Sequence, residues 1–244
     1  MEHKESVSIL VTAFHAQEFI EDCLNSIDSQ TYFQGFKKYE ILVGIDGCEE
    51  TLNQIQKIRK KYRNLSVYFM SENKGTYITT NTLISLAKYD CLIRFDSDDI
   101  MKPWMVAELM NGLDDTHNQI RCSCDNVDKN GNYEGNDAPV YPDGVCLWKK
   151  EVFDKLGGYM SWKCAADTEF IKRGRHYRII KTKTIEKRLF FRRIHSHSLT
   201  KHPDTGRNSN IRKSYRTYIR AETAKWNDRK LYISPETNTF KKIK

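Results

Sequence analysis

Three aspartates stand within four positions, at residues 96, 98 and 99, directly after the apolar run at 91–95. Carboxylates this close repel one another unless a cation or separate hydrogen-bond donors hold them. Mg²⁺ and Mn²⁺ prefer oxygen ligands, and they take one or two protein carboxylates while a substrate phosphate supplies further oxygens. The same residues could instead cap a helix that follows Pro103, since Asp99 or Ser97 can accept free amide protons. Taken alone, these residues leave metal binding and helix capping equally open.

The segments around this acidic run alternate between strand and helix patterns. Strands are predicted at 7–12, 39–45, 66–70 and 91–95, and helices at 17–30, 49–62 and 76–87. Such alternation predicts a mostly parallel sheet with right-handed crossovers, whose strand ends form a ligand crevice along one edge. The residues expected at that edge are 12–14, 46, 73–75 and 96–99. Neither GxGxxG after the first strand nor GxxxxGK[ST] occurs, which argues against a dinucleotide-binding fold and a P-loop.

The pattern is looser after Pro103. A helix to about residue 113 is followed by predicted strands at 120–125 and 140–148, with a turn-rich stretch at 129–139 between them. The remaining predictions are helices at 149–156 and from about 167, strands at 177–182 and 187–191, a polar loop at 192–200 and a helix at 211–226.

The length of 244 residues suits one large α/β domain, or a domain with an appendage. No apolar run approaches the roughly 20 residues needed to cross a bilayer, and the first residues lack the apolar core of a signal peptide. We therefore expect a soluble, cytoplasmic protein. The seven cysteines include no CxxC pair, so we expect reduced and mostly buried thiols.

Charge is distributed unevenly along the chain. Residues 172–244 hold 22 Lys and Arg against 5 Asp and Glu, whereas the preceding 171 residues hold 18 against 27. The acidic part fits a cation site, and the basic part fits contact with a diphosphate, a lipid surface or a nucleic acid backbone. A solvated basic surface that aids solubility is the alternative.

Several motifs occur in an order that is characteristic of one enzyme family. They are VTAFHAQEFIEDCLNSI, IDGCEET, ENKGTYITTN, RFDSDD, KKEVFDKLGGY followed by AADTEF, and RIHSHSLT. In this order they resemble the GT-A fold glycosyltransferases of the family 2 type, over roughly residues 6–200. Two positions depart from the family pattern. His15 stands where Asn is more usual, and Ile45 replaces the first of two acidic residues, so that only Asp46 remains.

The resemblance implies an α/β GT-A fold, a nucleotide-diphospho-sugar transferase fold with a central, mostly parallel sheet flanked by helices. We expect a catalytic domain at 1–200, with a nucleotide-sugar-binding part at 1–100 and an acceptor part at 101–200. Residues 201–244 would form a helical, basic C-terminal extension.

The resemblance also implies a metal-dependent donor site. Mn²⁺ or Mg²⁺ would be held by Asp98, by Asp96 and by His195 from the late loop, although the neighbouring His197 competes for that assignment. Asp46 would accept a hydrogen bond from the nucleobase, or merely form an Asp-Gly turn, and Phe14 would stack on it. Arg192, Arg193 and Lys74 could contact the diphosphate or be surface charge. The donor-binding residues expected are Thr12, Ala13, Phe14, Glu18, Asp46, Lys74, Gly75, Arg94, Asp96 and Ser97.

Asp167 is the expected general base for the acceptor hydroxyl. It stands at the start of a predicted helix beneath Trp162, where partial burial could raise its pKa. Glu169 is the alternative, on a different face of the same helix.

The function expected is inverting transfer of a sugar, with a UDP-sugar favoured as donor, to a hydroxyl of a glycan, a lipid-linked saccharide or a nucleic acid. The protein could then work peripherally at a membrane. Two alternatives remain open. One is a catalytically silent module that binds sugar nucleotides or glycans, and the other is a nucleotidyltransferase or phosphatase, which would need a second metal position.

Overall fold

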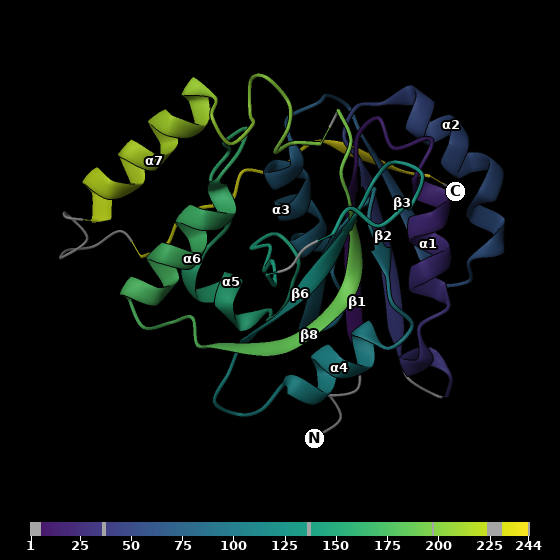
Figure 1. Ribbon diagram of the computed structural model, residues 1–244, viewed down its shortest axis with the longest axis horizontal. Coiled ribbons are helices and arrows are strands. Elements are labelled where there is room, and N and C mark those ends of the chain that lie inside the picture. The colour runs from purple at the N-terminus through teal and green to yellow at the C-terminus, as the bar shows by residue number, and fades with distance from the viewer. Residues whose placement is uncertain (1–5, 36–37, 136–137, 197, 224–230, 244) are drawn as a thin grey trace.

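The computed structural model describes residues 6–35, 38–135, 138–196, 198–223 and 231–243. Within these ranges one nine-stranded sheet runs through the molecule, in the order β5-β8-β6-β7-β4-β1-β2-β3-β9. Helices cover both faces of this sheet (Figure 1). The architecture is therefore the expected α/β sandwich.

Four adjacent parallel strands form the centre of the sheet. Their bounds are β1 (Val7–Ala13), β2 (Tyr39–Ile45), β3 (Leu65–Met70) and β4 (Cys91–Asp96), and they pair in the order β4-β1-β2-β3. Every residue of β1 is buried, because helices on both faces exclude water from a central parallel strand. All four strands were predicted from their apolar runs, and their parallel pairing is confirmed.

The side chains of β1 alternate between two hydrophobic clusters. Ile9 and Val11 pack towards α1, α2 and α4, whereas Leu10 packs towards α3, α5 and α6, as a period of two along a strand requires. The helices of the first layer are α1 (Ile20–Asp28), α2 (Glu49–Ile58) and α4 (Met105–Gly112). Those of the second are α3 (Thr76–Leu86), α5 (Glu151–Leu156) and α6 (Ala166–His176). Short 3₁₀ turns lie at Thr31–Phe33 and Arg59–Lys61.

The other half of the sheet is mixed and corrects two predictions. Its strands are β5 (Ile100–Met101), β6 (Gln119–Val127), β7 (Cys146–Lys149) and β8 (Thr182–Arg193). The strand predicted at 177–182 is wrong, because the N–H groups of Ile179 and Ile180 donate to the carbonyl of Gly174 and end α6. The strand predicted at 140–148 begins only at Cys146, since Pro142 and Gly144 interrupt it, although Val140 still forms an isolated bridge to Cys124.

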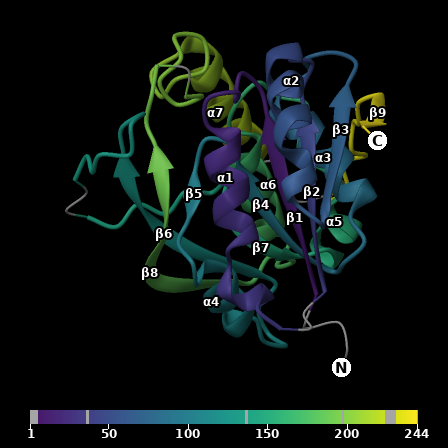
Figure 2. The same cartoon turned by 90° about the vertical axis from the view of Figure 1, so that its right-hand side faces the viewer.

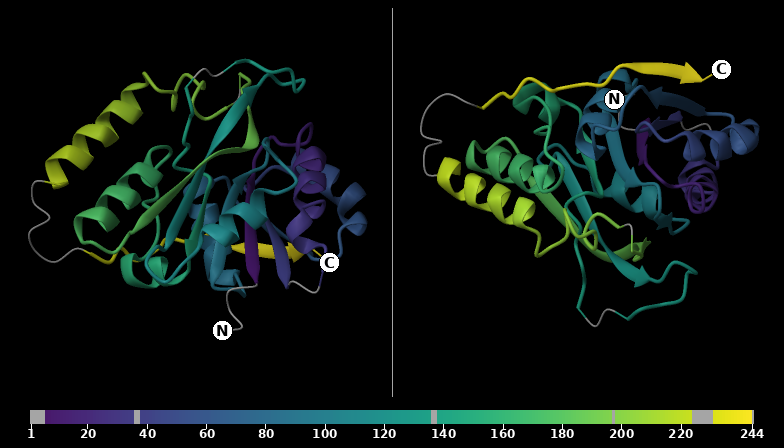
Figure 3. Two further views of the ribbon diagram at one scale, coloured as in Figure 1. Left: turned by 60° about the horizontal axis from the view of Figure 1, so that its bottom comes forward. Right: turned by 90° about the horizontal axis from the view of Figure 1, so that it is seen from above.

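The end of the chain is built into the domain. After α7 (Asn210–Thr223), residues 231–243 cross the molecule and end in β9 (Phe240–Ile243), which pairs antiparallel with β3 (Figure 3). On the way, Ile233 bridges Gly157, and the N–H of Asn238 donates to Thr82. The helix predicted at 211–226 is present up to Thr223, and its remainder lies outside the described residues. The edge strand was not predicted.

Two further expectations can be compared with the structure. All seven cysteines are buried and free of disulfide bonds, as predicted. Across the described ranges, every helix is too short or too polar to traverse a bilayer.

Candidate active site

The carboxyl ends of the parallel strands meet along one edge of the sheet (Figure 2). Thr12 of β1 lies opposite Asp96 of β4 on one side and opposite Gly44 of β2 on the other. Just beyond the strands, the N–H of Asp46 donates to the carbonyl of Ala13. The structure thus brings together side chains that are far apart in the sequence, as the parallel arrangement predicted.

Asp46 holds the loop before α3. Its two carboxylate oxygens accept the N–H groups of Lys74 and Gly75, at 3.0 and 2.8 Å. Burial raises the pKa of Asp46, although these two hydrogen bonds act in the opposite direction. Gly47 has a φ of +67°, and a Cβ there would lie 2.6 Å from the backbone nitrogen of Asn73. The Asp-Gly turn is therefore real, and the carboxylate still has lone pairs for a ligand.

The other residues expected at the nucleobase end differ in exposure. Phe14 is 47% exposed at the end of β1, so its ring face is accessible. Thr12 is buried and its hydroxyl is hydrogen-bonded to that of Thr76 at 2.8 Å. Glu18 and Lys74 are exposed, and Ser97 is buried.

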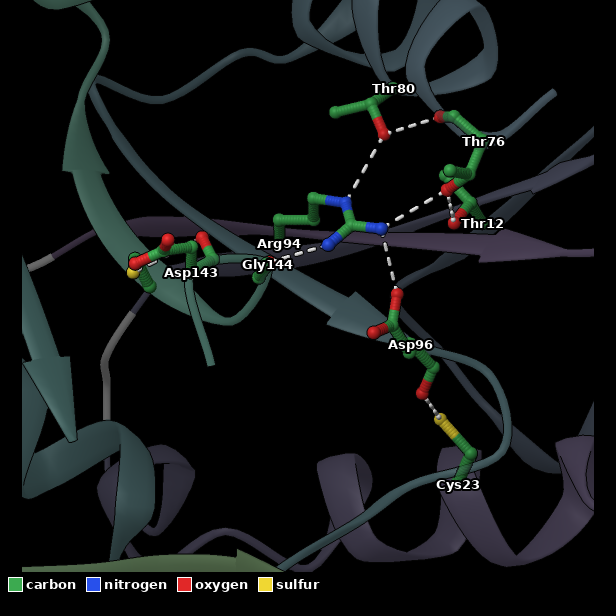
Figure 4. Close-up of polar contacts among 9 residues, drawn as sticks. Thr12, Cys23, Thr76, Thr80, Arg94, Asp96, Asp143 and Gly144 are labelled. Atoms are coloured by element: carbon green, nitrogen blue, oxygen red, sulfur yellow. Dashed lines mark hydrogen bonds and ion pairs between the residues drawn. The ribbon is translucent and has the colours of Figure 1, made fainter. Parts of the chain in front are cut away.

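Arg94 lies beneath the acidic run and connects three segments of the site (Figure 4). Its guanidinium donates to Oδ1 of Asp96 at 2.8 Å and to the carbonyl of Gly144 at 2.6 Å. It also donates to the hydroxyls of Thr76 and Thr80, at 3.1 and 3.4 Å. Burial opposes the charged form of Arg94, but the charge of Asp96, together with smaller contributions from Tyr77, Tyr159 and Asp167, raises the pKa of Arg94 overall. This network favours a role for Arg94 in positioning Asp96 rather than in direct contact with a donor.

Asp98 and His195 face each other although they are 97 residues apart. Nε2 of His195 lies 2.9 Å from Oδ2 of Asp98. Two neighbouring ligands of an octahedral ion, each about 2.1 Å from it, would be about 3 Å apart, so this spacing fits a shared ion. The carboxylate oxygen suits Mg²⁺ or Mn²⁺, and an imidazole nitrogen suits other first-row divalent ions. The backbone N–H of His195 donates to the hydroxyl of Ser198 at 3.1 Å, which holds this residue in place. His197 lies outside the described residues.

Asp99 ties the acidic turn to β8. Its buried carboxylate accepts the N–H of Arg193 at 2.9 Å. Burial, followed by the charges of Asp98 and Asp96, raises the pKa of Asp99 well above its ordinary value. The helix-capping alternative is wrong, because α4 starts after Trp104 and no side chain caps it. The carboxylates of the acidic run are therefore not engaged at the start of α4.

The two candidate arginines of β8 have different surroundings. Arg193 is buried, pairs with Asp22 at 3.1 Å and lies 4.8 Å above the ring of Phe19. Arg192 donates to Asn126 at 3.0 Å. The pKa of Asp96 is raised, first by burial and then by the charges of Asp98 and Asp167, and the positive charge of Arg192 partly offsets this rise. Arg192 is thus the better placed of the two for an anionic ligand.

Asp167 is the second residue of α6 and is half buried. Its Oδ1 accepts the N–H of Thr168 at 2.8 Å. Burial raises the pKa of Tyr77 well above its ordinary value, and Asp167 adds to this through its charge and a side-chain hydrogen bond. A Cβ on Gly144 would overlap the guanidinium of Arg94 and lie 3.8 Å from Oδ2 of Asp167, so Asp167 lies close to the side chain that holds Asp96.

Glu169 forms a buried ion pair with Arg173. Its carboxylate lies 2.7 Å from Nε of Arg173, and both side chains are almost fully buried. The guanidinium of Arg173 also donates to the carbonyls of Leu156, Gly158 and Leu231. This pairing removes Glu169 from the open part of the site.

A cavity of about 650 Å³ lies beside the site, next to Arg192 and Ile194. The loop after His195 forms much of its wall, and Lys201 and Arg207 make no ion pair with any described residue. Its other ionisable lining residues are Arg192, His202 and Glu134.

Three features of the site were not expected from the sequence. Tyr77 was assigned only to a helix, Gly144 was placed in a strand, and the cavity depends on a loop without regular structure. The signal for Tyr77 was its position directly after the predicted turn at 73–75 and at the start of a helix, where side chains face a ligand crevice.

Several proteins are similar to this chain. An uncharacterized glycosyltransferase of Haemophilus influenzae is 29% identical over 115 residues, which are 47% of this chain and 34% of that protein. The glycosyltransferase AglE of Haloferax volcanii is 32% identical over 93 residues, 38% of this chain and 30% of that protein. The matched stretch thus spans about a third of the length of these relatives.

Solved structures are similar over most of the chain. The mannosyltransferase PcManGT from Pyrobaculum calidifontis, in complex with GDP-Man and Mn²⁺, has a TM-score of 0.70, at 14% identity over 91% of this chain and 65% of that chain. TarS of S. aureus, in complex with UDP-GlcNAc, has a TM-score of 0.65, at 17% identity over 90% and 71%. These likenesses confirm the GT-A fold. The model of the family described as glycosyl transferase family 2 matches residues 8–219, and the chain belongs to that family.

Proposed function

We propose that this protein transfers a sugar from a nucleoside diphosphate sugar to an acceptor hydroxyl, with inversion at the anomeric carbon. The observation that carries this proposal is the meeting of Asp98 with His195 beside Asp96, within reach of the charge of Asp167. Sugar transfer needs metal-binding groups for the donor diphosphate and, next to them, a carboxylate that can accept the proton of the acceptor hydroxyl.

We propose a UDP-sugar as the donor. Its base would stack on the exposed ring of Phe14, and Asp46 would accept a hydrogen bond from the ring N–H. The similar structures were solved with UDP-GlcNAc in one case and GDP-Man in the other, so the fold accommodates both uracil and guanine. The rest of the nucleotide would lie along Thr12, Ala13, Lys74, Gly75 and Ser97.

Asp98 and His195 would hold Mn²⁺ or Mg²⁺, with Asp96 on the ion through water or on the ribose. A bound divalent ion stabilises the negative charge that develops on a departing diphosphate. Arg94 keeps Asp96 in place, and Arg192 adds positive charge beside the phosphates.

Asp167 would accept the proton of the acceptor hydroxyl. As that proton leaves, the acceptor oxygen bonds to the anomeric carbon, and the bond from that carbon to the diphosphate oxygen breaks with its electron pair. Tyr77 would orient Asp167 through their hydrogen bond.

The acceptor is proposed to carry an anionic group, such as the phosphate of a lipid-linked saccharide, that binds in the 650 Å³ cavity. Lys201 and Arg207 supply positive charge there. Such an acceptor would bring the protein to a membrane surface. Binding to anionic vesicles that falls as salt rises would support this. Retention of duplex DNA alone would favour a nucleic acid instead, and binding to neither would refute an anionic acceptor.

The function is tested by calorimetry of donor binding with and without Mn²⁺. Asp98→Asn should abolish the Mn²⁺-dependent part of UDP-sugar binding, because it removes the ligand charge of the paired site. Asp154→Asn, an exposed carboxylate on α5, is the matched control and should change nothing. If Asp98→Asn bound the donor with unchanged Mn²⁺ dependence, the proposed metal site would be wrong.

A further inference from the structure

A second group of metal-ligating side chains lies where the end of β1 meets the start of α2. It consists of His15, Cys48 and Glu50, whose ligand atoms all lie within 4.8 Å of one another. Sγ of Cys48 is 3.6 Å from Nδ1 of His15 and 3.3 Å from Oε2 of Glu50. We propose that these three residues bind a tetrahedral transition-metal ion such as Zn²⁺, at a site separate from Asp98 and His195.

The spacing of the ligand atoms supports a tetrahedral ion. Zinc bonds of about 2.3 Å to sulfur and about 2.0–2.1 Å to nitrogen or oxygen place neighbouring ligand atoms about 3.5 Å apart at a tetrahedral angle. The two contacts of the Cys48 sulfur, at 3.6 and 3.3 Å, lie on either side of that value. The third pair, between His15 and Glu50, lies within 4.8 Å, so these two side chains would have to approach each other by at most about 1.4 Å to close the site.

The chemistry of the three donors selects the ion. A thiolate, an imidazole and a carboxylate together suit Zn²⁺ and Co²⁺ far better than Mg²⁺, which prefers oxygen ligands alone. The thiol of Cys48 now donates to Glu50. On metal binding this proton passes to solvent, and the ion takes its place between the sulfur and the carboxylate. His15 and Glu50 are exposed, so water can occupy the fourth position.

The surroundings hold two of the ligands in place. The hydroxyl of Thr51 donates to the sulfur of Cys48 at 3.2 Å, and it is itself fixed by the N–H of Ala16 at 2.9 Å. Hydrogen bonds of this kind orient a ligand and stabilise its charged form. His15 has a φ of +50°, an uncommon conformation for a residue other than glycine. This turn directs its ring towards Cys48.

The site joins the two turns that border the proposed nucleobase position. His15 follows Phe14, with their ring centres 4.1 Å apart, and Cys48 follows the turn of Asp46. A bound ion would therefore fix the separation of these two turns. This consequence for donor binding rests on the proposed function, whereas the metal site itself does not.

Co²⁺ binding to the full chain tests the site, because a cobalt–thiolate bond gives a near-ultraviolet charge-transfer band and tetrahedral cobalt gives intense visible bands. We expect both signals to saturate at one ion per chain and to be displaced by Zn²⁺. Cys48→Ser should abolish the charge-transfer band. His15→Asn and Glu50→Gln, at exposed positions, should each weaken binding more than tenfold without affecting folding.

Two controls separate this site from the rest of the protein. Cys164→Ser removes a thiol elsewhere and should leave the spectrum unchanged. Asp98→Asn should also leave it unchanged, even where that variant loses Mn²⁺-dependent donor binding, so the two proposals can fail independently. A charge-transfer band that survives Cys48→Ser in folded protein, or octahedral cobalt bands without any thiolate band, would overturn the proposal.

Discussion

Asp167 and Glu169 stand two residues apart on α6, and we predict opposite consequences for their amide variants. Glu169→Gln should lower the stability of the protein and leave the chemistry of the folded enzyme intact. Asp167→Asn should leave stability nearly unchanged and slow sugar transfer. The difference follows from their partners, because Glu169 is buried against Arg173 whereas Asp167 is half buried at the edge of the site.

The size of the stability loss follows from the geometry of the ion pair. Glu169 lies 2.7 Å from Arg173, with side chains 4% and 1% exposed respectively. Removing one partner of such a buried pair costs roughly 3–5 kcal/mol. Gln keeps one acceptor oxygen, and Arg173 keeps three backbone carbonyls, so we expect about 3 kcal/mol, the lower end of that range. For a chain of this size the melting temperature should fall by about 6–12 °C.

The rate loss for Asp167→Asn is expected to be about 100-fold or more, the usual scale for a missing general base. The amide oxygen can still accept the N–H of Thr168, so the start of α6 should remain intact. Donor affinity should be retained, since the proposed donor contacts lie elsewhere.

Both variants can be measured with the same two assays. Urea unfolding followed by tryptophan fluorescence gives stability, and transfer to the acceptor is measured at a temperature where both variants are fully folded. These roles of Asp167 and Glu169 are wrong if Glu169→Gln is as stable as the wild type but slow, or if Asp167→Asn transfers sugar at the wild-type rate. The first result would move the base to Glu169, and the second would remove Asp167 from the mechanism.

Three further predictions follow from contacts around the site and the sheet. Arg94→Lys should weaken donor binding about tenfold in calorimetry, because one ammonium group cannot replace the four contacts of the guanidinium and a hydrogen bond to a charged group contributes about 1.5–3 kcal/mol. Unchanged donor affinity would show that this network does not position Asp96. Burial alone would raise the pKa of Asp125, but hydrogen bonds from Lys102 and Arg188 lower it overall. The ionised Asp125 carboxylate therefore stabilises the fold fully at pH values above the ordinary aspartate pKa, and this stabilisation is lost as the pH falls through the lowered pKa of the folded protein. The stability gap between the wild type and Asp125→Asn in urea should therefore be full at pH 7 and shrink below about pH 4, and a gap that is constant with pH would contradict this. Gly157→Ala should lower the free energy of unfolding by about 1–3 kcal/mol and expose residues 231–243 to protease, because Gly157 has a φ of +75° and a Cβ there would overlap the carbonyl of Ile233. Gly131 also has a positive φ but open space around it, so Gly131→Ala is the control. Equal protease sensitivity in the two variants would refute the role of the contact with Ile233.

The central part of the fold could be predicted from the amino-acid sequence alone. Four apolar runs, each followed by a helical pattern or a polar turn, predicted the parallel strands and placed Asp46 and Asp96 at one edge. These signals are local, because a buried parallel strand and an amphipathic helix each produce a recognisable pattern of apolar residues within a short stretch of sequence. The order of the motifs was enough to indicate the family.

The role of each polar residue depends on contacts that form only when the chain folds. Arg192 and Arg193 are adjacent in sequence, yet one lines a cavity and the other is paired with Asp22. The strand β9 and the contact between Asp98 and His195 likewise join residues far apart in the chain. The energy of a charged or polar side chain depends on its burial and on its partner, and both are supplied by segments that meet only when the chain folds.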